Sequence, residues 1–263
     1  NLLQFPVALY GVLRAGLVAV SVNPLYTARE LAHQLSDSGA SAIIAVANAG
    51  AVVGEALAQT AVRHVVITEI GDMLPFPRRQ LVNFVVRRVR RLVPAYRLPA
   101  AIPFDRALRH AGPLAPVVIT GADLACLQYT GGTTGVARGA MLSHGNLLAN
   151  VRQINTWFAS LVRPGVEVVI TALPLYHVYA LTCNGLAYTE LGGHNILITD
   201  PRDIAGFIRE LRRWKFTAIT GVNTLYQHLA SHPALKDVDF SHLKVVSAGG
   251  MAVQRAVAEK WKQ

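Results

Sequence analysis

Short apolar runs with the composition of buried strands alternate with helix-like segments along most of this chain. Ala42–Val46 and His64–Thr68 are two such runs, and the helix-like segment Ala51–Gln59 lies between them. Strands of one sheet that are joined through a helix run parallel. The alternation therefore predicts an α/β fold in which stacked, mainly parallel sheets carry helices between them.

Local signals and composition agree with this fold class. Thr27 and Glu30 have the spacing of a capping box, which predicts a helix that begins after Thr27 and ends near Gly39. The chain has 263 residues, of which 52% are hydrophobic, and this is enough to bury a large core. The apolar stretch at the start contains Arg14 and is too short to span a membrane, so we expect a buried helix there.

The strand and helix rhythm breaks at about 72–104 and resumes after Leu114. We therefore expect a first α/β subdomain over residues 1–114, with an insertion at about 72–104. A second α/β subdomain is expected over residues 115–263.

The insertion is strongly basic. Between Met73 and Phe104 there are seven arginines and no acidic residue, within a chain whose formal net charge is +10. Gln80–Val93 has the pattern of an amphipathic cationic helix, and its arginines are Arg87, Arg88, Arg90 and Arg91. Two interpretations stay open, a solvated helix packed on the domain and a helix drawn to an anionic membrane surface. We expect no nucleic-acid partner, because no recognisable nucleic-acid module accompanies the patch.

The stretch YTGGTTGVARGAM, from Tyr129 to Met141, has the parts of a phosphate-binding loop. Glycines allow successive backbone N–H groups to face an anion, threonine hydroxyls add donors and can ligate magnesium, and Arg138 supplies positive charge. Neither G-x-x-x-x-G-K-[ST] nor G-x-G-x-x-G matches it. From these residues alone, a flexible hairpin between two strands stays open as the alternative.

Other common chemistries lack their signatures. No HExxH, paired CxxC or GxSxG occurs in the sequence. Cys126 and Cys183 have apolar surroundings, which predicts two buried thiols in a reducing compartment.

The order of residues in the loop is more specific than its composition. TGGTTGVARGAMLSHGN, preceded by LQY, resembles the signature [ST]-[SG]-G-[ST]-T-G-x-P-K-G of the adenylate-forming superfamily. Ala137 takes the place of the usual proline, and Arg138 that of the usual lysine. A guanidinium is a planar fork and an ammonium a point charge, so the second exchange is not neutral for phosphate contact. The matching residues are Thr130, Gly131, Gly132, Thr133, Thr134, Gly135 and Gly139.

Further segments resemble bacterial long-chain fatty-acid CoA ligases within that superfamily. They are FPVALYGVLRAGLVAVSVNPLYTARELAHQLSDSGASAIIAV, ALPLYHVYALT, FTAITGVNTLYQHL and LKVVSAGGMAVQ. The resemblance implies the N-terminal portion of the adenylate-forming fold.

The resemblance also implies a role for each matched segment. The loop residues would hold the β- and γ-phosphates of ATP, Thr130 would also ligate Mg²⁺, and His177 would position the substrate near its carboxylate. The adenine and acyl pocket would be lined by Gly221, Val222, Asn223, Thr224, Ser247, Ala248, Gly249, Gly250 and Met251. Ordinary explanations stay open: a hydrogen-bonded core histidine, a turn capped by Thr224, and a plain turn after Ser247.

The implied activity is the ATP-dependent conversion of long-chain fatty acids to acyl-CoA through an acyl-adenylate, with ATP, Mg²⁺ and coenzyme A. The expected location is cytoplasmic, peripheral on the inner membrane through the four arginines, and a homodimer is left open. Two alternatives stay open, a ligase for another carboxylic acid and a non-catalytic fatty-acid- or membrane-binding module. Both chain ends lie within helix-like patterns and the family's Y-G-x-T-E motif does not occur. We therefore expect a piece of a longer protein that is inactive alone.

Overall fold

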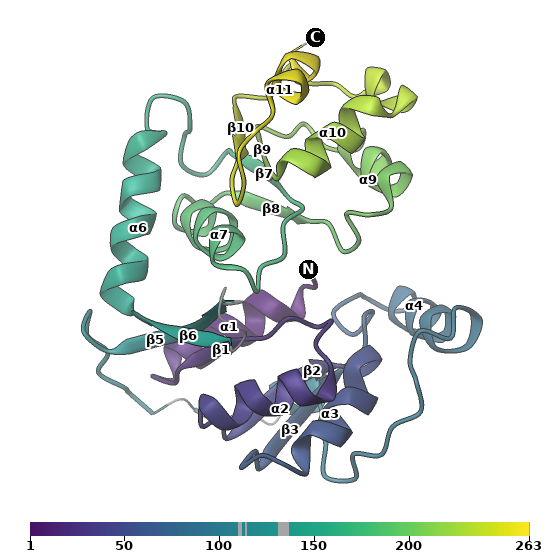
Figure 1. Ribbon diagram of the computed structural model, residues 1–263, viewed down its shortest axis with the longest axis vertical. Coiled ribbons are helices and arrows are strands. Elements are labelled where there is room, and N and C mark those ends of the chain that lie inside the picture. Colours follow the sequence, from purple (N-terminus) through teal and green to yellow (C-terminus); the bar gives the residue numbers. More distant parts are fainter. Residues whose placement is uncertain (110–111, 114, 131–136, 263) are drawn as a thin grey trace. The chain divides into compact units, whose positions relative to one another are not determined.

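The computed structural model describes residues 1–109, 112–113, 115–130 and 137–262. The chain divides into two compact units (Figure 1). Pro6–His144 form one unit, here called the N-unit, and Asn1–Phe5 together with Gly145–Gln263 form the other, here called the C-unit. This division lies after His144, whereas the sequence predicted one near residue 114.

The strand pairing explains the difference. In the N-unit, β1 (Ala19–Ser21) pairs in parallel with β5 (Leu124–Thr130), and β5 pairs antiparallel with β6 (Arg138–Ser143). These bonds attach residues 124–143 to the sheet that β1 begins. Resumption of the strand and helix rhythm therefore does not mark the start of a new unit.

The second N-unit sheet has the order β2-β3-β4 and is parallel. The predicted strands at Ala42–Val46 and His64–Thr68 are confirmed as β2 and β3, and the predicted capping box is present on α2. Thr27 Oγ1 accepts from the Glu30 N–H at 3.3 Å, and Glu30 Oε2 accepts from the Thr27 N–H at 2.7 Å. The remaining elements are α1 (Gln4–Arg14), α2 (Ala28–Asp37), η1 (Ala47–Ala49), α3 (Gly50–Leu57), α4 (Arg78–Phe84), η2 (Val85–Val89), β4 (Ile102–Pro103) and α5 (Phe104–Arg109).

An apolar cluster joins this sheet to α2 and α3. Leu31 and Leu35 of α2 and Val53 of α3 are at most 3% exposed, and they pack with Ile43 and Val65 of the strands. Helices that connect parallel strands must cover a sheet face in this way, and the burial accounts for the alternation seen in the sequence.

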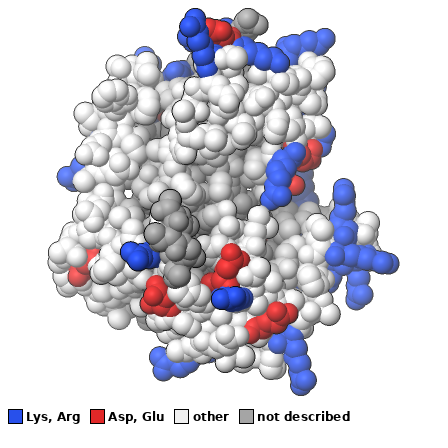
Figure 2. Space-filling model, in the orientation of Figure 1, with Lys and Arg blue, Asp and Glu red and all other residues white. Residues whose placement is uncertain are grey.

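The predicted helix of the insertion is present and ends earlier than expected. It consists of α4 followed by η2, a five-residue π-helical turn that ends at Val89. Figure 2 shows Lys and Arg side chains gathered over the part of the molecule that Figure 1 labels α4. Large apolar side chains are exposed beside them: Leu81 is 63%, Phe84 59% and Val89 62% accessible.

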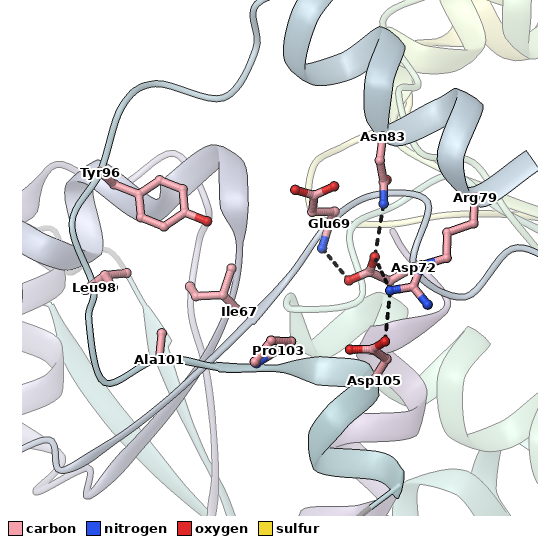
Figure 3. A pocket seen from close by; sticks show the side chains of 10 residues that line it. All are labelled: Ile67, Glu69, Asp72, Arg79, Asn83, Tyr96, Leu98, Ala101, Pro103 and Asp105. Atoms are coloured by element: carbon pink, nitrogen blue, oxygen red, sulfur yellow. Dashed lines mark hydrogen bonds and ion pairs between the residues drawn. The ribbon is translucent and has the colours of Figure 1, made fainter.

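Carboxylates at the end of β3 hold the insertion in place (Figure 3). Asp72, whose side chain is 8% exposed, accepts from Asn83 Nδ2 at 3.0 Å, from Thr68 Oγ1 at 3.0 Å and from the Glu69 N–H at 2.8 Å. Because each carboxylate oxygen has a donor inside the protein, Asp72 works as a structural anchor for α4.

Two arginines of the insertion extend this cluster. Arg79 Nη2 lies 3.0 Å from Asp105 Oδ2 and 3.4 Å from Asp72 Oδ1, and Arg87 donates to Glu69. The hydrogen bond from Arg79 holds the pKa of Asp105 below its ordinary value. The cluster borders a cavity of about 370 Å³, whose other wall is apolar and includes Ile67, Leu98, Ala101 and Pro103 (Figure 3).

The C-unit contains one parallel sheet of order β10-β9-β7-β8. Its strands are β7 (Val168–Thr171), β8 (His194–Leu197), β9 (Ala218–Gly221) and β10 (Val245–Ala248). Its helices are α6 (His144–Trp157), α7 (Val178–Ala180), η3 (Leu181–Ala187), α8 (Tyr188–Glu190), α9 (Ile204–Leu211), α10 (Asn223–Ser231), η4 (Pro233–Asp237) and α11 (Arg255–Trp261).

The main core of the C-unit lies between this sheet and helices α9 and α10. Ile170 and Ile219 of the strands pack with Phe207, Leu211 and Leu229 of the helices, and none is more than 1% exposed. Within the part of the chain that the structure describes, no helix is both long enough and apolar enough to cross a membrane.

An ion pair lies at the start of the C-unit sheet. Glu167 is 1% exposed, and its Oε1 accepts from Lys244 Nζ at 2.7 Å and from the Arg163 N–H at 2.7 Å. Burial acts to raise the pKa of Glu167, but the hydrogen bonds from Lys244, Thr217 and the Arg163 amide outweigh it, so the net pKa lies below its ordinary value.

Candidate active site

The candidate active site in the C-unit lies at the carboxyl edge of its sheet. Because all four strands are parallel, the segments that follow β7, β9 and β10 emerge at the same edge. His177 follows β7, Gly221–Thr224 follow or end β9, and Ser247–Met251 end or follow β10. The structure thus brings these three predicted segments to the edge where ligands bind in α/β sheets.

His177 forms the N-cap of α7. Its Nδ1 accepts from the Tyr179 N–H at 3.3 Å, and the side chain is exposed. A ring that accepts at Nδ1 carries the proton of its neutral form on Nε2. His177 can therefore present an Nε2–H donor to a carboxylate or phosphate oxygen. The alternative of a core histidine is wrong, because the side chain is exposed.

The loop before His177 is held by the first residue of the chain. Asn1 Nδ2 donates to the carbonyl oxygens of Thr171 and Leu173, both at 2.9 Å, and Asn1 Oδ1 accepts from the Leu175 N–H at 2.9 Å. These bonds fix the path between the end of β7 and His177. No sequence pattern pointed to this role.

Two glycines of the predicted pocket make room for tyrosine rings. A Cβ at Gly249 would lie 3.1 Å from the ring of Tyr179, and one at Gly221 would lie 2.8 Å from that of Tyr226. Both distances are tighter than ordinary packing allows. The resemblance places both glycines in the adenine and acyl pocket, and the structure supplies a packing reason for each of them. Gly250 has a φ of +79°, a conformation that favours glycine.

The turn after β9 does not have a threonine cap. The N-cap of α10 is Val222, which makes no side-chain capping bond, so the explanation that relied on Thr224 is wrong. Asn223, which is 4% exposed, instead accepts from the Gln254 N–H at 2.8 Å through its Oδ1. Asn223 therefore ties the start of α10 to the segment that follows β10.

A chain of hydrogen-bonded polar side chains connects η3 with strands β7, β8 and β9 near the carboxyl edge of the sheet. Thr220 Oγ1 donates to Asn184 Oδ1 at 2.8 Å, and Asn184 Nδ2 donates to Thr171 Oγ1 at 3.0 Å. Thr171 Oγ1 in turn donates to Asn195 Oδ1 at 2.8 Å. Asn184 is fully buried in η3, a π-helical segment, and π-helical turns are frequent at functional sites. The signal in the sequence was a polar residue within an apolar run.

An apolar hollow lies between α6, η3 and the sheet. It holds about 20 Å³, roughly the space of one water molecule. Thr220 and Ser247 at the carboxyl ends of β9 and β10 contribute to its lining. The other lining residues are Ile154, Asn155, Phe158, Val162, Cys183, Tyr188, Leu191 and Val245.

The predicted phosphate-binding loop belongs to the N-unit. Its ends are described: Thr130 ends β5, Arg138 begins β6, and the two residues are paired in the antiparallel register. Both are exposed. Gly131, Gly132, Thr133, Thr134 and Gly135 lie outside the described residues. The loop thus connects two strands of a hairpin, which is compatible with both the phosphate-binding and the plain hairpin interpretation.

The strands beside the loop are anchored through Tyr129. A Cβ at Gly139 would lie 2.9 Å from the Tyr129 ring, which explains the glycine at that position. The Tyr129 hydroxyl donates to Asp37 of α2, and burial together with this carboxylate raises the pKa of Tyr129 to about 12. His33 Nε2 lies 3.4 Å from the Ala137 carbonyl oxygen. These contacts fix the described ends of the loop on the body of the N-unit.

Comparison with known proteins assigns this arrangement to a family. The sequence model of the family described as "AMP-binding enzyme" matches residues 1–263. The chain belongs to the AMP-binding enzyme family. Long-chain-fatty-acid–CoA ligases of Escherichia coli O157:H7 and Yersinia pestis are 55% and 54% identical to it over 99% and 100% of the chain. The chain spans 47% of the length of each of these relatives, about half.

Solved structures confirm the predicted fold of this AMP-binding enzyme. A red-emitting luciferase from Phrixothrix hirtus superposes with a TM-score of 0.76 at 18% identity, over 99% of this chain and 46% of the luciferase. The predicted α/β class, the N-terminal portion of the adenylate-forming fold, is therefore correct. The roles predicted for single residues stay predictions.

Proposed function

We propose that the full-length protein carrying this chain activates long-chain fatty acids with ATP and transfers them to coenzyme A. The observation that carries the proposal is the 55% identity, over 99% of the chain, to a long-chain-fatty-acid–CoA ligase.

The reaction has two steps. A carboxylate oxygen of the fatty acid attacks the α-phosphorus of ATP, and the bond from that phosphorus to the bridging oxygen breaks, which releases pyrophosphate. The thiolate of coenzyme A then attacks the acyl carbonyl carbon, and AMP leaves. The first step, a nucleotidyl transfer, depends mainly on positioning and charge neutralisation.

Each predicted residue would have a specific task. His177 would donate from Nε2 to the substrate and hold its carboxylate at the edge of the sheet. Arg138, with the loop amides, would neutralise the terminal phosphates. Ser247–Met251 would line the place where the acyl carbonyl meets the adenine.

The Thr130 hydroxyl fits a magnesium ion that is held mainly by nucleotide phosphates. The described residues contain no group of three or more His, Cys, Asp or Glu that could hold a metal ion by itself. Mg²⁺ in nucleotide sites usually takes only one or two protein ligands and completes its shell with phosphate oxygens and waters. When bound, Mg²⁺ would supply neutralisation of the phosphate charge.

An ATP–pyrophosphate exchange assay with the full-length protein tests this function. We expect exchange that depends on palmitate and exceeds exchange with octanoate or benzoate. Faster pyrophosphate exchange with benzoate than with palmitate would favour a ligase for another carboxylic acid. ATP binding without any acid-dependent exchange would contradict an adenylate-forming activity and favour a binding module.

We also propose that the insertion docks the protein on anionic membrane lipid, which would place the enzyme at the inner face of the cytoplasmic membrane. Arg88, Arg90 and Arg91 are exposed, and none forms an ion pair with a described residue. Arg87 differs from them, because it donates to Glu69. Exposed Leu81 and Phe84 supply apolar surface beside this charge.

Charge reversal at Arg88, Arg90 and Arg91 is expected to weaken binding to phosphatidylglycerol vesicles about 30-fold, since each basic group contributes on the order of 1 kcal/mol before salt screening. Vesicle sedimentation measures it. The control reverses three exposed arginines elsewhere, Arg29, Arg63 and Arg152, and changes the net charge equally. Equal loss in both variants would show non-specific attraction and contradict a defined surface.

A further inference from the structure

Ser247 is bonded through both its side chain and its main chain to tyrosine hydroxyls. Ser247 Oγ lies 2.8 Å from Tyr179 Oη, and the Ser247 carbonyl oxygen accepts from Tyr226 Oη at 2.7 Å. Tyr226 Oη lies also 3.2 Å from the Ile219 carbonyl oxygen. The end of β10 is thereby fixed to the end of β9 by Tyr226 and to the start of α7 by Tyr179.

Tyr179 connects three parts of the candidate site by itself. Its N–H donates to His177 Nδ1, its hydroxyl bonds Ser247, and its ring occupies the space that the missing Cβ of Gly249 leaves open. His177 belongs to the segment after β7, while Ser247 and Gly249 belong to the segment at the end of β10. Displacement of the Tyr179 side chain would therefore remove a direct link between these two segments.

We propose that Tyr179 is a positioning residue, whose hydroxyl bond to Ser247 sets the spacing between His177 and the segment Ser247–Met251. This proposal rests on the proposed function, in which the two segments hold the carboxylate and the adenylate. Tyr179 acts through His177 and Ser247, and its effect is on the alignment of the groups that react.

The chemistry of the bond favours positioning over packing alone. A phenylalanine would fill the space beside Gly249 as well as Tyr179 does, so packing does not require the hydroxyl. Ser247 also lines the apolar hollow, where an unbonded hydroxyl would be costly. The bond satisfies both hydroxyls at the place where a polar reacting group and an apolar chain would meet.

The test uses Tyr179→Phe, Ser247→Ala and the double variant in the full-length protein. We expect each single variant to lower kcat of palmitate-dependent pyrophosphate exchange about tenfold, with KM values for ATP and palmitate changed less than about twofold. The double variant should be no slower than either single variant, because both substitutions remove the same bond. Tyr26→Phe, which removes a phenol hydroxyl in the N-unit, is the matched control. Its kcat for palmitate-dependent pyrophosphate exchange should equal that of the unsubstituted protein.

Hydrogen–deuterium exchange gives a readout that is independent of activity. We expect the amides of residues 247–251 to exchange about tenfold faster in both single variants and unchanged in Tyr26→Phe. Multiplicative losses in the double variant, a lowered melting temperature with unchanged kcat, or unchanged amide exchange would each overturn the proposal. If the unsubstituted protein shows no acid-dependent exchange, the proposed function fails, and the amide exchange still decides whether Tyr179 positions this segment.

Discussion

Replacement of Arg138 by alanine is expected to lower kcat/KM for ATP by about 100- to 1,000-fold in the full-length protein. A positioned donor that stabilises charge in a transition state commonly has an effect of this size. The structure places Arg138 at the first position of β6, opposite Thr130, so its backbone is fixed by the hairpin while its side chain is exposed. Steady-state kinetics with saturating palmitate measure the change.

Lysine at this position separates charge from shape. Arg138→Lys restores the residue usual in the adenylate-forming signature, and we expect activity within about tenfold of the unsubstituted protein, because an ammonium group neutralises phosphate but does not bind it as a fork. Arg138→Gln keeps hydrogen-bonding capacity without charge and should resemble alanine. If the alanine variant were as active as the unsubstituted protein, Arg138 would have no part in phosphate binding and the plain hairpin interpretation would regain support.

Replacement of Lys244 by methionine is expected to lower the free energy of unfolding by about 2 kcal/mol, since the buried carboxylate of Glu167 would lose its counter-charge, although solvent partly screens Lys244, whose side chain is 34% exposed. Glu167, which is 1% exposed, would keep the hydrogen bonds from Thr217 and the Arg163 amide but would have lost its cation. Urea denaturation at pH 7 measures the loss. Lys236→Met, at an exposed position, is the matched control and should change the free energy by less than about 0.5 kcal/mol.

The contribution of Glu167 to the free energy of unfolding depends on pH with a defined sign. The pKa of Glu167 in the folded protein lies below its ordinary value, so its ionised form contributes stability at neutral pH. That contribution is fully present above the unfolded-state pKa of glutamate, about 4.3, and is lost as pH falls through the folded-state value. Lys244→Met should remove this acid sensitivity. The double variant Glu167→Leu, Lys244→Met should recover much of the lost stability, and equal destabilisation of the double and single variants would contradict the account.

Regular periodicity in the sequence predicted most elements correctly. Ala42–Val46 and His64–Thr68 were predicted with the bounds that the structure has, because short β-branched runs between helical segments usually form buried strands. The capping box at Thr27 was recognised because its two side chains are close in sequence. Parallel strands then bring His177, Gly221–Thr224 and Ser247–Met251 to one edge.

Features that depend on contacts between distant residues were missed. Pairing of β1 with β5 decides where the units divide, and it joins residues about a hundred positions apart in a way that no local pattern records. In the sequence, Tyr179 is an ordinary aromatic residue two positions after a histidine. Its positioning role can be inferred only from the folded structure, in which it contacts Ser247 and Gly249. The bond of Arg87 to Glu69 likewise separates one arginine from three neighbours that the sequence treated as equivalent.

The side-chain bonds of Asn1 have a consequence for the order of folding. They close a chain loop of about 170 residues around the segment that leads to His177. Contacts of such long sequence separation form late, because the entropy of loop closure must first be overcome by other contacts. The segment between β7 and His177 would therefore reach its final geometry only after the C-unit sheet has formed. On refolding of the full-length protein, we expect the last part of the activity to return more slowly than the secondary structure.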